Sequence, residues 1–264
     1  MIQSNTVRVG AVSYLNTVPL VWGMLHGTQV SEVDLSFSIP SRCADRLREG
    51  SIDLGIVPVA EIARHQWTIV SEVGISCLGA VRSILLCSRS SFRNLKTLAA
   101  DESSRTSVEL ARVVLAERYG CEPAIVPAAP DWRRMLEQAD GALIIGDPAL
   151  RMDPDTLGCN YLDLGQEWFR MTGLPMVFAA WASRPELADS NQAARFRQIT
   201  LGSYKFGAQH LDEIVAAEYT HRGVSEELAR EYLTRHIRFE IGEAERRGLL
   251  AFYELARLTR VMAV

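Results

Sequence analysis

Four short polar loops contain the side chains of this sequence that are best suited to bind or transform a small molecule. They are the segments 13–17, 81–84, 101–109 and 144–148, and each adjoins one end of an apolar run of strand length. Open α/β sheets bind ligands at the carboxyl ends of their strands, where such loops meet. The loops therefore predict a single small-molecule site built from segments far apart in the chain.

The first loop reads Ser13-Tyr14-Leu15-Asn16-Thr17. In one interpretation Asn16 or Thr17 caps the helix that follows, while Tyr14 packs. In the other, Asn16 faces a cleft and orients a substrate hydroxyl, because its amide is both a donor and an acceptor. The residues themselves leave both interpretations open.

The segment 101–109 is unusually rich in hydroxyl groups. Thr106 and Glu109 fit a capping box at the start of an amphipathic helix. Ser104 and Ser107, on either side of Arg105, exceed what one cap requires. Hydroxyl groups, free backbone N–H groups and the positive end of a helix together favour an anion. We expect an anion site here.

The other two loops offer one polar group each. Ser83 comes just before an apolar strand, where it either bonds a neighbouring strand or faces a ligand. Asp147 follows another apolar run. It either caps a helix before Pro148 or places its carboxylate in the site. The preceding Gly146 allows a close approach of backbone.

The elements that must position these loops alternate between strand and helix patterns. This alternation predicts an α/β fold with βαβ units around a largely parallel sheet. Expected strands are 7–15, 33–39, 52–57, 81–88, 142–145 and 176–183. One expected helix ends near Gly27, and others span 42–49, 106–119 and 131–138. After Arg184 only helices are expected, at 193–206, 211–219, 225–235 and 243–257.

The segment between the strands at 81–88 and 176–183 resembles a second, complete α/β unit. We therefore expect two lobes, residues 1–82 plus 184–264 and residues 83–183, joined by two crossover strands near Val81 and Ala182. Such a connection implies a hinge and a cleft between the lobes. Trp168 and Trp181 are expected to pack in the core.

Composition excludes several function classes. The 28 Lys and Arg against 32 Asp and Glu give a net charge of −4 without charged runs, so neither nucleic acid nor membrane is an expected partner. The five scattered cysteines predict reduced packing residues. Motifs for nucleotides and metals are absent, the histidines are isolated, and we expect no metal and no cofactor. Met1 to Thr6 is short and polar, without a signal-peptide pattern, which predicts a cytoplasmic protein.

The loops and their surroundings resemble the chorismate dehydratase family of the futalosine route to menaquinone. The resemblance spans nearly the whole chain, and its pieces are specific only together. They are GAVSYLNTVPL at 10–20, IPSRCADRLREGSIDLGIVPVAEI at 39–62, GAVRSILLCS at 79–88, DESSRTSVELA at 101–111, LIIGDPAL at 143–150 and DLGQEWFRMTGLPMVFAAWA at 163–182.

The resemblance implies a two-lobed type 2 periplasmic-binding-protein-like fold and a reaction without metal or organic cofactor. That reaction removes water from chorismate, a small dianion, and gives 3-[(1-carboxyvinyl)oxy]benzoate. Asn16 and Ser83 are implied as polar catalytic groups. The base is either the enolpyruvyl carboxylate of the substrate or Asp147. Implied substrate-binding residues are Ser13, Tyr14, Ser41, Ser104, Arg105, Thr106 and Ser107, with Arg42 and Arg82 as alternative counter-charges to Arg105.

Two rival functions stay open on the sequence. A binding protein of the same fold would capture a small anion without turnover, because fold alone does not fix function. A sister lyase of the same route cleaves cyclic dehypoxanthinyl futalosine to form 1,4-dihydroxy-6-naphthoate and also has this fold. The SYLNT, VRSIL and SSRTS segments resemble the dehydratase. A homodimer is compatible with the sequence.

Overall fold

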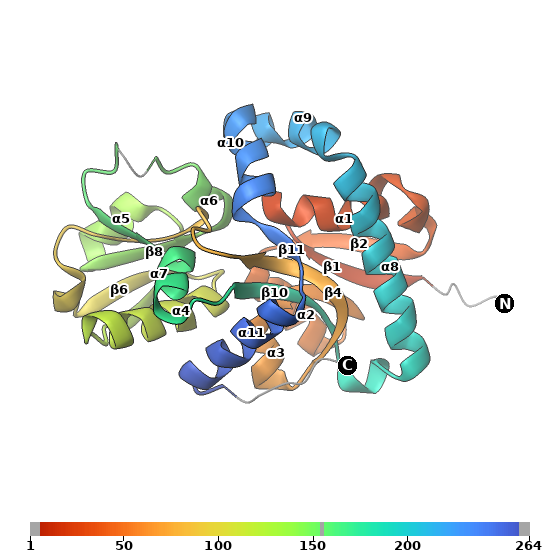
Figure 1. The fold of residues 1–264 in the computed structure, drawn as a ribbon, viewed down its shortest axis with the longest axis horizontal. Helices are drawn as coiled ribbons and strands as arrows, with labels where there is room; N and C mark the ends of the chain where they lie inside the picture. Colours follow the sequence, from red (N-terminus) through yellow and green to blue (C-terminus); the bar gives the residue numbers. More distant parts are fainter. Residues whose placement is uncertain (1–5, 154–155, 259–264) are drawn as a thin grey trace.

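Two β-sheets divide the chain into two lobes (Figure 1). The structure is a computed structural model that describes residues 6–153 and 156–258, so most of the polar segment Met1 to Thr6 lies outside the described residues. Within the described ranges the first sheet has the strand order β11-β4-β10-β3-β1-β2 and the second the order β7-β6-β8-β5-β9. The predicted α/β class is confirmed.

The strands of the first sheet come from both ends of the sequence. They are β1 (Val7–Val12), β2 (Val33–Ser38), β3 (Leu54–Pro58), β4 (Thr68–Cys77), β10 (Met176–Ser183) and β11 (Arg238–Glu240). Those of the second sheet are β5 (Ile84–Ser88), β6 (Thr97–Asp101), β7 (Ala124–Ala128), β8 (Gly141–Ile145) and β9 (Asn160–Asp163). The short strand β11 shows that the expectation of helices alone after Arg184 is wrong.

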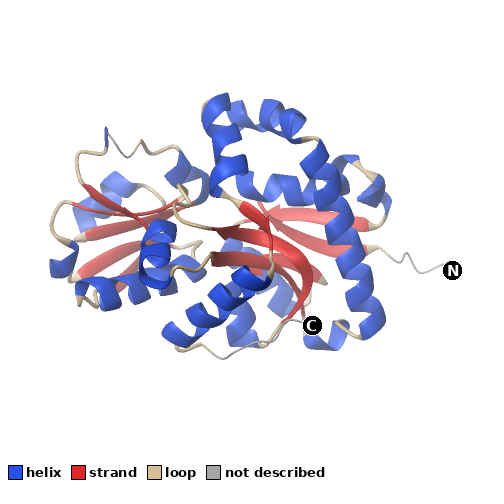
Figure 2. Ribbon diagram, viewed as in Figure 1, coloured by secondary structure: helices blue, strands red, loops and turns tan. Residues whose placement is uncertain are grey.

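Helices flank the strands of both lobes (Figure 2). In the first lobe they are α1 (Val18–His26), α2 (Pro40–Glu49), α3 (Val59–His65), α8 (Ser190–Gln209), α9 (Leu211–Arg222), α10 (Glu226–Glu231) and α11 (Glu243–Leu255). In the second they are α4 (Thr106–Val114), α5 (Trp132–Gln138), α6 (Gly146–Leu150) and α7 (Leu164–Thr172). A turn of π-helix, Leu115–Tyr119, extends α4 to Gly120, whose φ of +61° ends the helix as its position predicted.

Both sheets are mixed rather than largely parallel. Strand β1 runs parallel to β2 and β3, whereas β10 runs antiparallel to β3 and β4. The reason is the path of the chain: β10 brings it back from the second lobe, opposite to the strands that lead toward that lobe. The chain leaves the first sheet between Cys77 and Ile84 and re-enters it at Met176. Residues 176–183, which the expected boundaries grouped with the second lobe, thus pair in the first sheet.

Apolar side chains fill the space between strands and helices. Trp168 and Trp181 are fully buried, and the indole N–H of Trp168 donates to the Pro175 carbonyl at 3.0 Å, which confirms their predicted packing role. The five cysteines are free, four of them buried and Cys159 half-buried. Across residues 6–153 and 156–258, no helix has both the length and the apolar character needed to cross a membrane.

Candidate active site between the lobes

A cavity lies where the two sheets face each other. The space between its lining atoms is about 550 Å³, which includes some open solvent. Most of its wall is apolar, with contributions from Val12, Pro40, Pro58, Ile75, Val81, Ile84, Ile145, Phe178 and Ala179. The polar lining comes from both lobes and consists of Tyr14, Asn16, Ser83, Ser104, Arg105, Thr106 and Ser107.

Asn16 reaches the cavity because β1 ends at Val12 and the chain turns through a short 3-10 segment, Leu15–Thr17, into α1. Its side chain is buried and does not cap the helix, and neither does that of Thr17, so the capping interpretation is wrong. Instead, the Asn16 amide Nδ2 donates to the hydroxyl of Tyr232 at 2.9 Å.

Tyr232 is the residue of this site that the sequence did not reveal. It begins a turn of π-helix, Tyr232–His236, and its hydroxyl donates to Ser83 Oγ at 2.7 Å. The residue is 1% exposed, and burial raises the pKa of its phenol above the usual range. No local signal marks it, because its partners lie 216 and 149 positions earlier in the chain.

Ser83 is held in place by the crossover between the sheets. The buried Asp163 carboxylate accepts the backbone N–H groups of Val81 at 3.0 Å and Arg82 at 2.6 Å, and burial raises its pKa. Arg82 has a φ of +68°, an unusual backbone conformation for a residue with a side chain. Because its guanidinium donates to the Ala149 and Met152 carbonyls, Arg82 is not a counter-charge in the cavity. Neither is Arg42, which pairs with Glu49 at 3.0 Å on the surface.

The second lobe presents the N-terminus of α4 to the cavity. Ser104, Thr106 and Ser107 are buried there, and the Ser104 Oγ has no hydrogen-bond partner among the described residues. A buried hydroxyl without a partner costs free energy unless a ligand or water satisfies it. Together with the free N–H groups of the helix end, this hydroxyl suits an anionic ligand.

Thr106 has a different role from the predicted cap. Its Oγ1 donates to the Phe178 carbonyl at 3.1 Å and accepts the Ala60 N–H at 3.2 Å, so it joins α4 to the first lobe. The capping box is wrong, since Arg105 is the N-cap, without a side-chain bond, and Glu109 pairs with Arg64 across the lobes.

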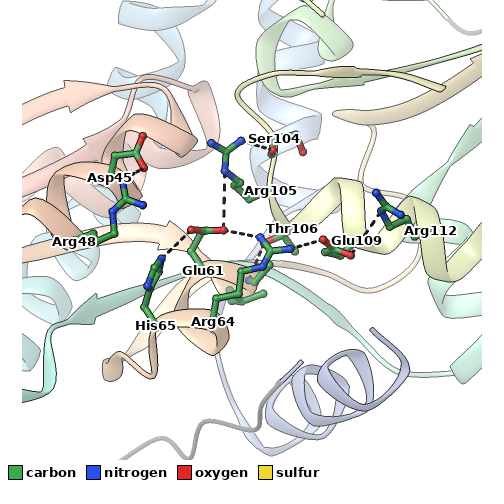
Figure 3. A network of polar contacts seen from close by, with 12 residues as sticks. Asp45, Arg48, Glu61, Arg64, His65, Ser104, Arg105, Thr106, Glu109 and Arg112 are labelled. Carbon is green, nitrogen blue, oxygen red and sulfur yellow. Dashed lines mark hydrogen bonds and ion pairs between the residues drawn. The ribbon is translucent and has the colours of Figure 1, made fainter. Parts of the chain in front are cut away.

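Arg105 lines the cavity and belongs to a network of polar contacts (Figure 3). Its guanidinium donates to the carbonyls of Glu102 and Ser104, and its Nε lies 4.0 Å from a carboxylate oxygen of Glu61. Glu61 on α3 also pairs with Arg64 at 2.6 Å and contacts His65 at 3.4 Å. This network of charges connects α3 with the start of α4.

Asp147 does not line the cavity. Its Oδ1 accepts the Leu15 N–H at 2.9 Å and its Oδ2 pairs with Arg222 at 3.0 Å, so both oxygens are occupied by the first lobe. Burial raises the pKa of this carboxyl, whereas the Leu15 N–H and Arg222 oppose that rise. The residue fastens the lobes together.

Ser13 and Ser41 also lie outside the lining of the cavity. Ser13 is exposed, and its carbonyl accepts from Arg222 at 2.6 Å. The buried Ser41 donates its backbone N–H to the Ser103 carbonyl of the other lobe at 3.1 Å. The Ser41 contact therefore joins the two lobes, whereas the Ser13 contact lies within the first lobe.

Tyr14 crosses between the lobes beside the cavity. Its hydroxyl lies 3.1 Å from Ser103 Oγ, which itself donates to Asp101 Oδ1 at 2.7 Å, so Tyr14 is the donor to Ser103. Burial raises the pKa of Tyr14 to about 12. The Tyr14 ring packs on Gly146, and a Cβ added at Gly146 would lie 2.5 Å from that ring. The group that approaches this glycine closely is therefore an aromatic ring.

The described residues include no group of three or more His, Cys, Asp or Glu side chains arranged to hold a metal ion. Among the described residues that line the cavity, none is Asp, Glu or His. The site thus offers hydroxyl, amide and guanidinium groups in an apolar enclosure. Such a set orients a substrate and stabilises negative charge.

Residues 7–258 match a family model described as menaquinone biosynthesis. A curated relative, the chorismate dehydratase of Thermus thermophilus, is 27% identical over 269 residues, which cover 93% of each chain.

Two solved structures have the same fold. A protein of Archaeoglobus fulgidus aligns with a TM-score of 0.78 at 17% identity, covering 97% of this chain and 98% of that one. The periplasmic aliphatic sulphonate binding protein of Escherichia coli aligns with a TM-score of 0.62 at 14% identity, covering 99% and 94%. The expected two-lobed periplasmic-binding-protein-like fold is confirmed.

Proposed function

The chain belongs to the menaquinone biosynthesis family, and on that premise we propose that it is a chorismate dehydratase, a hydro-lyase. The Thermus thermophilus relative with that name aligns along 93% of the chain. The observation that carries the proposal is the cavity between the lobes, where an anion-binding helix end faces the polar groups Asn16 and Ser83.

The proposed reaction is an elimination. A base takes the C3 proton of the substrate ring, and the electron pair of the C3–H bond forms a ring double bond. The C4 hydroxyl takes up a proton as the C4–O bond breaks, so that it leaves as water. The product is 3-[(1-carboxyvinyl)oxy]benzoate, and aromatisation drives the step. The demands on the protein are orientation, stabilisation of charge that spreads to the ring carboxylate, and a hydrogen bond to the leaving hydroxyl.

Asn16 and Ser83 meet these demands at the reacting ring. Both line the cavity, and both are hydrogen-bonded to Tyr232, so their side chains are fixed before substrate binds. An amide is too weak a base to remove a carbon-bound proton at neutral pH. Asn16 therefore orients the substrate, and Ser83 donates to an oxygen that gains negative charge.

The substrate carboxylates are bound by the other side of the cavity. Ser104, with its unpartnered hydroxyl, Ser107 and the free N–H groups of α4 form the anion site. Arg105 in the lining supplies a positive charge, and Thr106 holds the start of the helix against the first lobe.

We assign the base to the substrate's own enolpyruvyl carboxylate. Among the described residues that line the cavity none is a carboxylate or a histidine. Asp147, the alternative, is held by Leu15 and Arg222 outside the lining. The reaction then needs no metal or organic cofactor. A cytoplasmic location and a homodimer stay predictions.

The test is to mix the purified protein with chorismate, without added cofactor, and to follow the products by chromatography and mass. Enolpyruvyl benzoate formed in proportion to the protein supports the proposal. A chorismate-induced rise in melting temperature without product favours the binding protein. If neither appears, cyclic dehypoxanthinyl futalosine is tested next, and its cleavage would favour the sister lyase.

A further inference from the structure

The hydroxyl of Tyr232 lies between the two polar groups that face the reacting ring. It accepts from Asn16 Nδ2 at 2.9 Å and donates to Ser83 Oγ at 2.7 Å. The three residues come from the loop after β1, the π-helical turn after α10 and the crossover to β5. Folding is therefore required to assemble them.

The direction of these hydrogen bonds follows from the protons available. A phenol has one proton, and an amide nitrogen is only a donor, so the Tyr232 proton must point to Ser83. Thr17 Oγ1 lies 3.5 Å from Asn16 Oδ1, on the acceptor side of the amide, which agrees with Nδ2 facing Tyr232. Because burial raises the pKa of Tyr232, the phenol keeps its proton at neutral pH.

The consequence falls on Ser83. Its oxygen already accepts the Tyr232 proton, and its own proton is left for another acceptor. Ser83 lines the cavity, so that acceptor is an oxygen of a bound molecule. Each bond in such a chain also polarises the next one, which strengthens the final donor.

We propose that Tyr232 is a positioning residue that turns Ser83 into a hydrogen-bond donor toward the substrate oxygen on which negative charge develops. This inference rests on the proposed dehydration and assigns a residue that acts through Ser83 without touching the substrate. Its effect belongs to the transition state more than to ground-state binding, because the charge on that oxygen grows during reaction.

The test compares Tyr232→Phe with a matched control, Tyr253→Phe. Tyr253 is equally buried, but its hydroxyl donates to the Val59 carbonyl at 3.0 Å and it does not line the cavity. We expect Tyr232→Phe to lower kcat about tenfold or more with KM changed less than about twofold. The control should keep the wild-type kcat.

A double-variant cycle separates positioning from packing. If Tyr232 acts through Ser83, then Tyr232→Phe should lower kcat less in the Ser83→Ala background than in the wild type, and the loss that remains there comes from its bond to Asn16. Single-turnover measurements with enzyme in excess extend the range to slow variants. An unchanged kcat in Tyr232→Phe, or effects that multiply in the double variant, would overturn the inference.

Two further outcomes are also decisive. If the wild type does not dehydrate chorismate, the proposed function fails first, and the role of Tyr232 in it fails as well. If Tyr232→Phe does not fold, fluorotyrosine incorporated at position 232 keeps the packing and makes the phenol a stronger donor. A kcat that rises with phenol acidity supports positioning, and a kcat indifferent to it contradicts positioning.

Discussion

The carboxylate of Asp147 accepts the backbone N–H of Leu15 at 2.9 Å, although Asp147 lies in the first turn of a helix of the second lobe and Leu15 belongs to the first lobe. Its other oxygen pairs with Arg222 at 3.0 Å. Leu15 immediately precedes Asn16, so this contact fixes the loop that brings Asn16 to the cavity. The contact between the lobes and the position of the Asn16 amide, which we propose acts in catalysis, are therefore linked.

Replacing Asp147 by Ala should impair both closure and catalysis. The change leaves the Leu15 N–H without its acceptor and Arg222 without one partner, and we expect unfolding free energy to fall by about 2 kcal/mol. Because closure aligns the cavity, kcat should fall and KM should rise together, as steady-state kinetics will measure. Asp140→Ala is the control, since Asp140 accepts the N–H groups of Lys96 and Thr97 within one lobe. Equal kinetic effects in both variants would contradict the interlobe role.

Ser104→Ala should weaken substrate binding while it leaves the fold intact. The Ser104 Oγ has no partner among the described residues, so its removal breaks no hydrogen bond of the protein that the structure shows. We expect KM to rise about tenfold, which corresponds to about 1.4 kcal/mol for one bond to a carboxylate. The melting temperature should not change.

Ser103→Ala is the contrasting variant for Ser104. Ser103 Oγ bonds Asp101 at 2.7 Å and Tyr14 at 3.1 Å, so its loss should lower the melting temperature. A wild-type KM in Ser104→Ala would remove Ser104 from the anion site.

Gly146→Ala should lower activity as well as stability, because the added Cβ would displace the Tyr14 ring beside the cavity. Gly146 has a φ of +64°, and an added Cβ would lie 2.5 Å from the Tyr14 ring. Gly120→Ala is a matched control, because Gly120 has a φ of +61° with nothing within 4 Å of its Cβ position. Both changes should cost about 1 kcal/mol or more of stability from the left-handed backbone. Only Gly146→Ala should also lower kcat/KM; equal activity in the two variants would refute the interlobe contact.

Asp101→Asn should change how stability depends on pH. Burial raises the pKa of Asp101 above its ordinary value, and its Oδ2 has no partner among the described residues. A raised pKa in the folded state means that ionisation disfavours folding above that pKa, and the penalty disappears as pH falls to the unfolded value near 3.8. The amide keeps the Ser103 bonds on Oδ1 without a charge.

Urea unfolding at pH 7 and at pH 4.5 measures this difference. We expect the variant to be more stable than the wild type at pH 7 and to lose part of that advantage at pH 4.5. An advantage that grows as pH falls would show that the Asp101 carboxylate stabilises the fold.

Local signals located many of the elements, because those signals act over one or two turns, but the sequence analysis did not name the strands β4, β6, β7 and β9. Gly120 ends the helix that begins at Thr106, and Gly50 ends α2 with a φ of +76°, as their positions indicated. The predicted side-chain caps were wrong where the polar side chain bonds a distant part of the chain. The Thr106 hydroxyl bonds Phe178 and Ala60 instead of its own helix, since the first lobe supplies better-placed backbone groups.

The composition of the site was predictable only in part. Strand-end loops indicated that Asn16, Ser83 and Ser104 would meet, and the structure places all three around the cavity. Tyr232 was not predictable, because its role depends on contacts across most of the chain. The role of Asp147 needed the fold as well, because a carboxylate at a strand end has the same sequence signature whether it faces a cavity or the other lobe.

The most direct test of the central claim is the initial rate of 3-[(1-carboxyvinyl)oxy]benzoate formation from chorismate by the wild type and by Asn16→Ala, measured side by side. We predict a wild-type rate proportional to enzyme concentration. The variant should be slower by about a hundredfold or more, while its melting temperature and its binding of chorismate persist. No product from the wild type, or equal rates from both proteins, would contradict a dehydration that takes place at Asn16 in the cavity between the lobes.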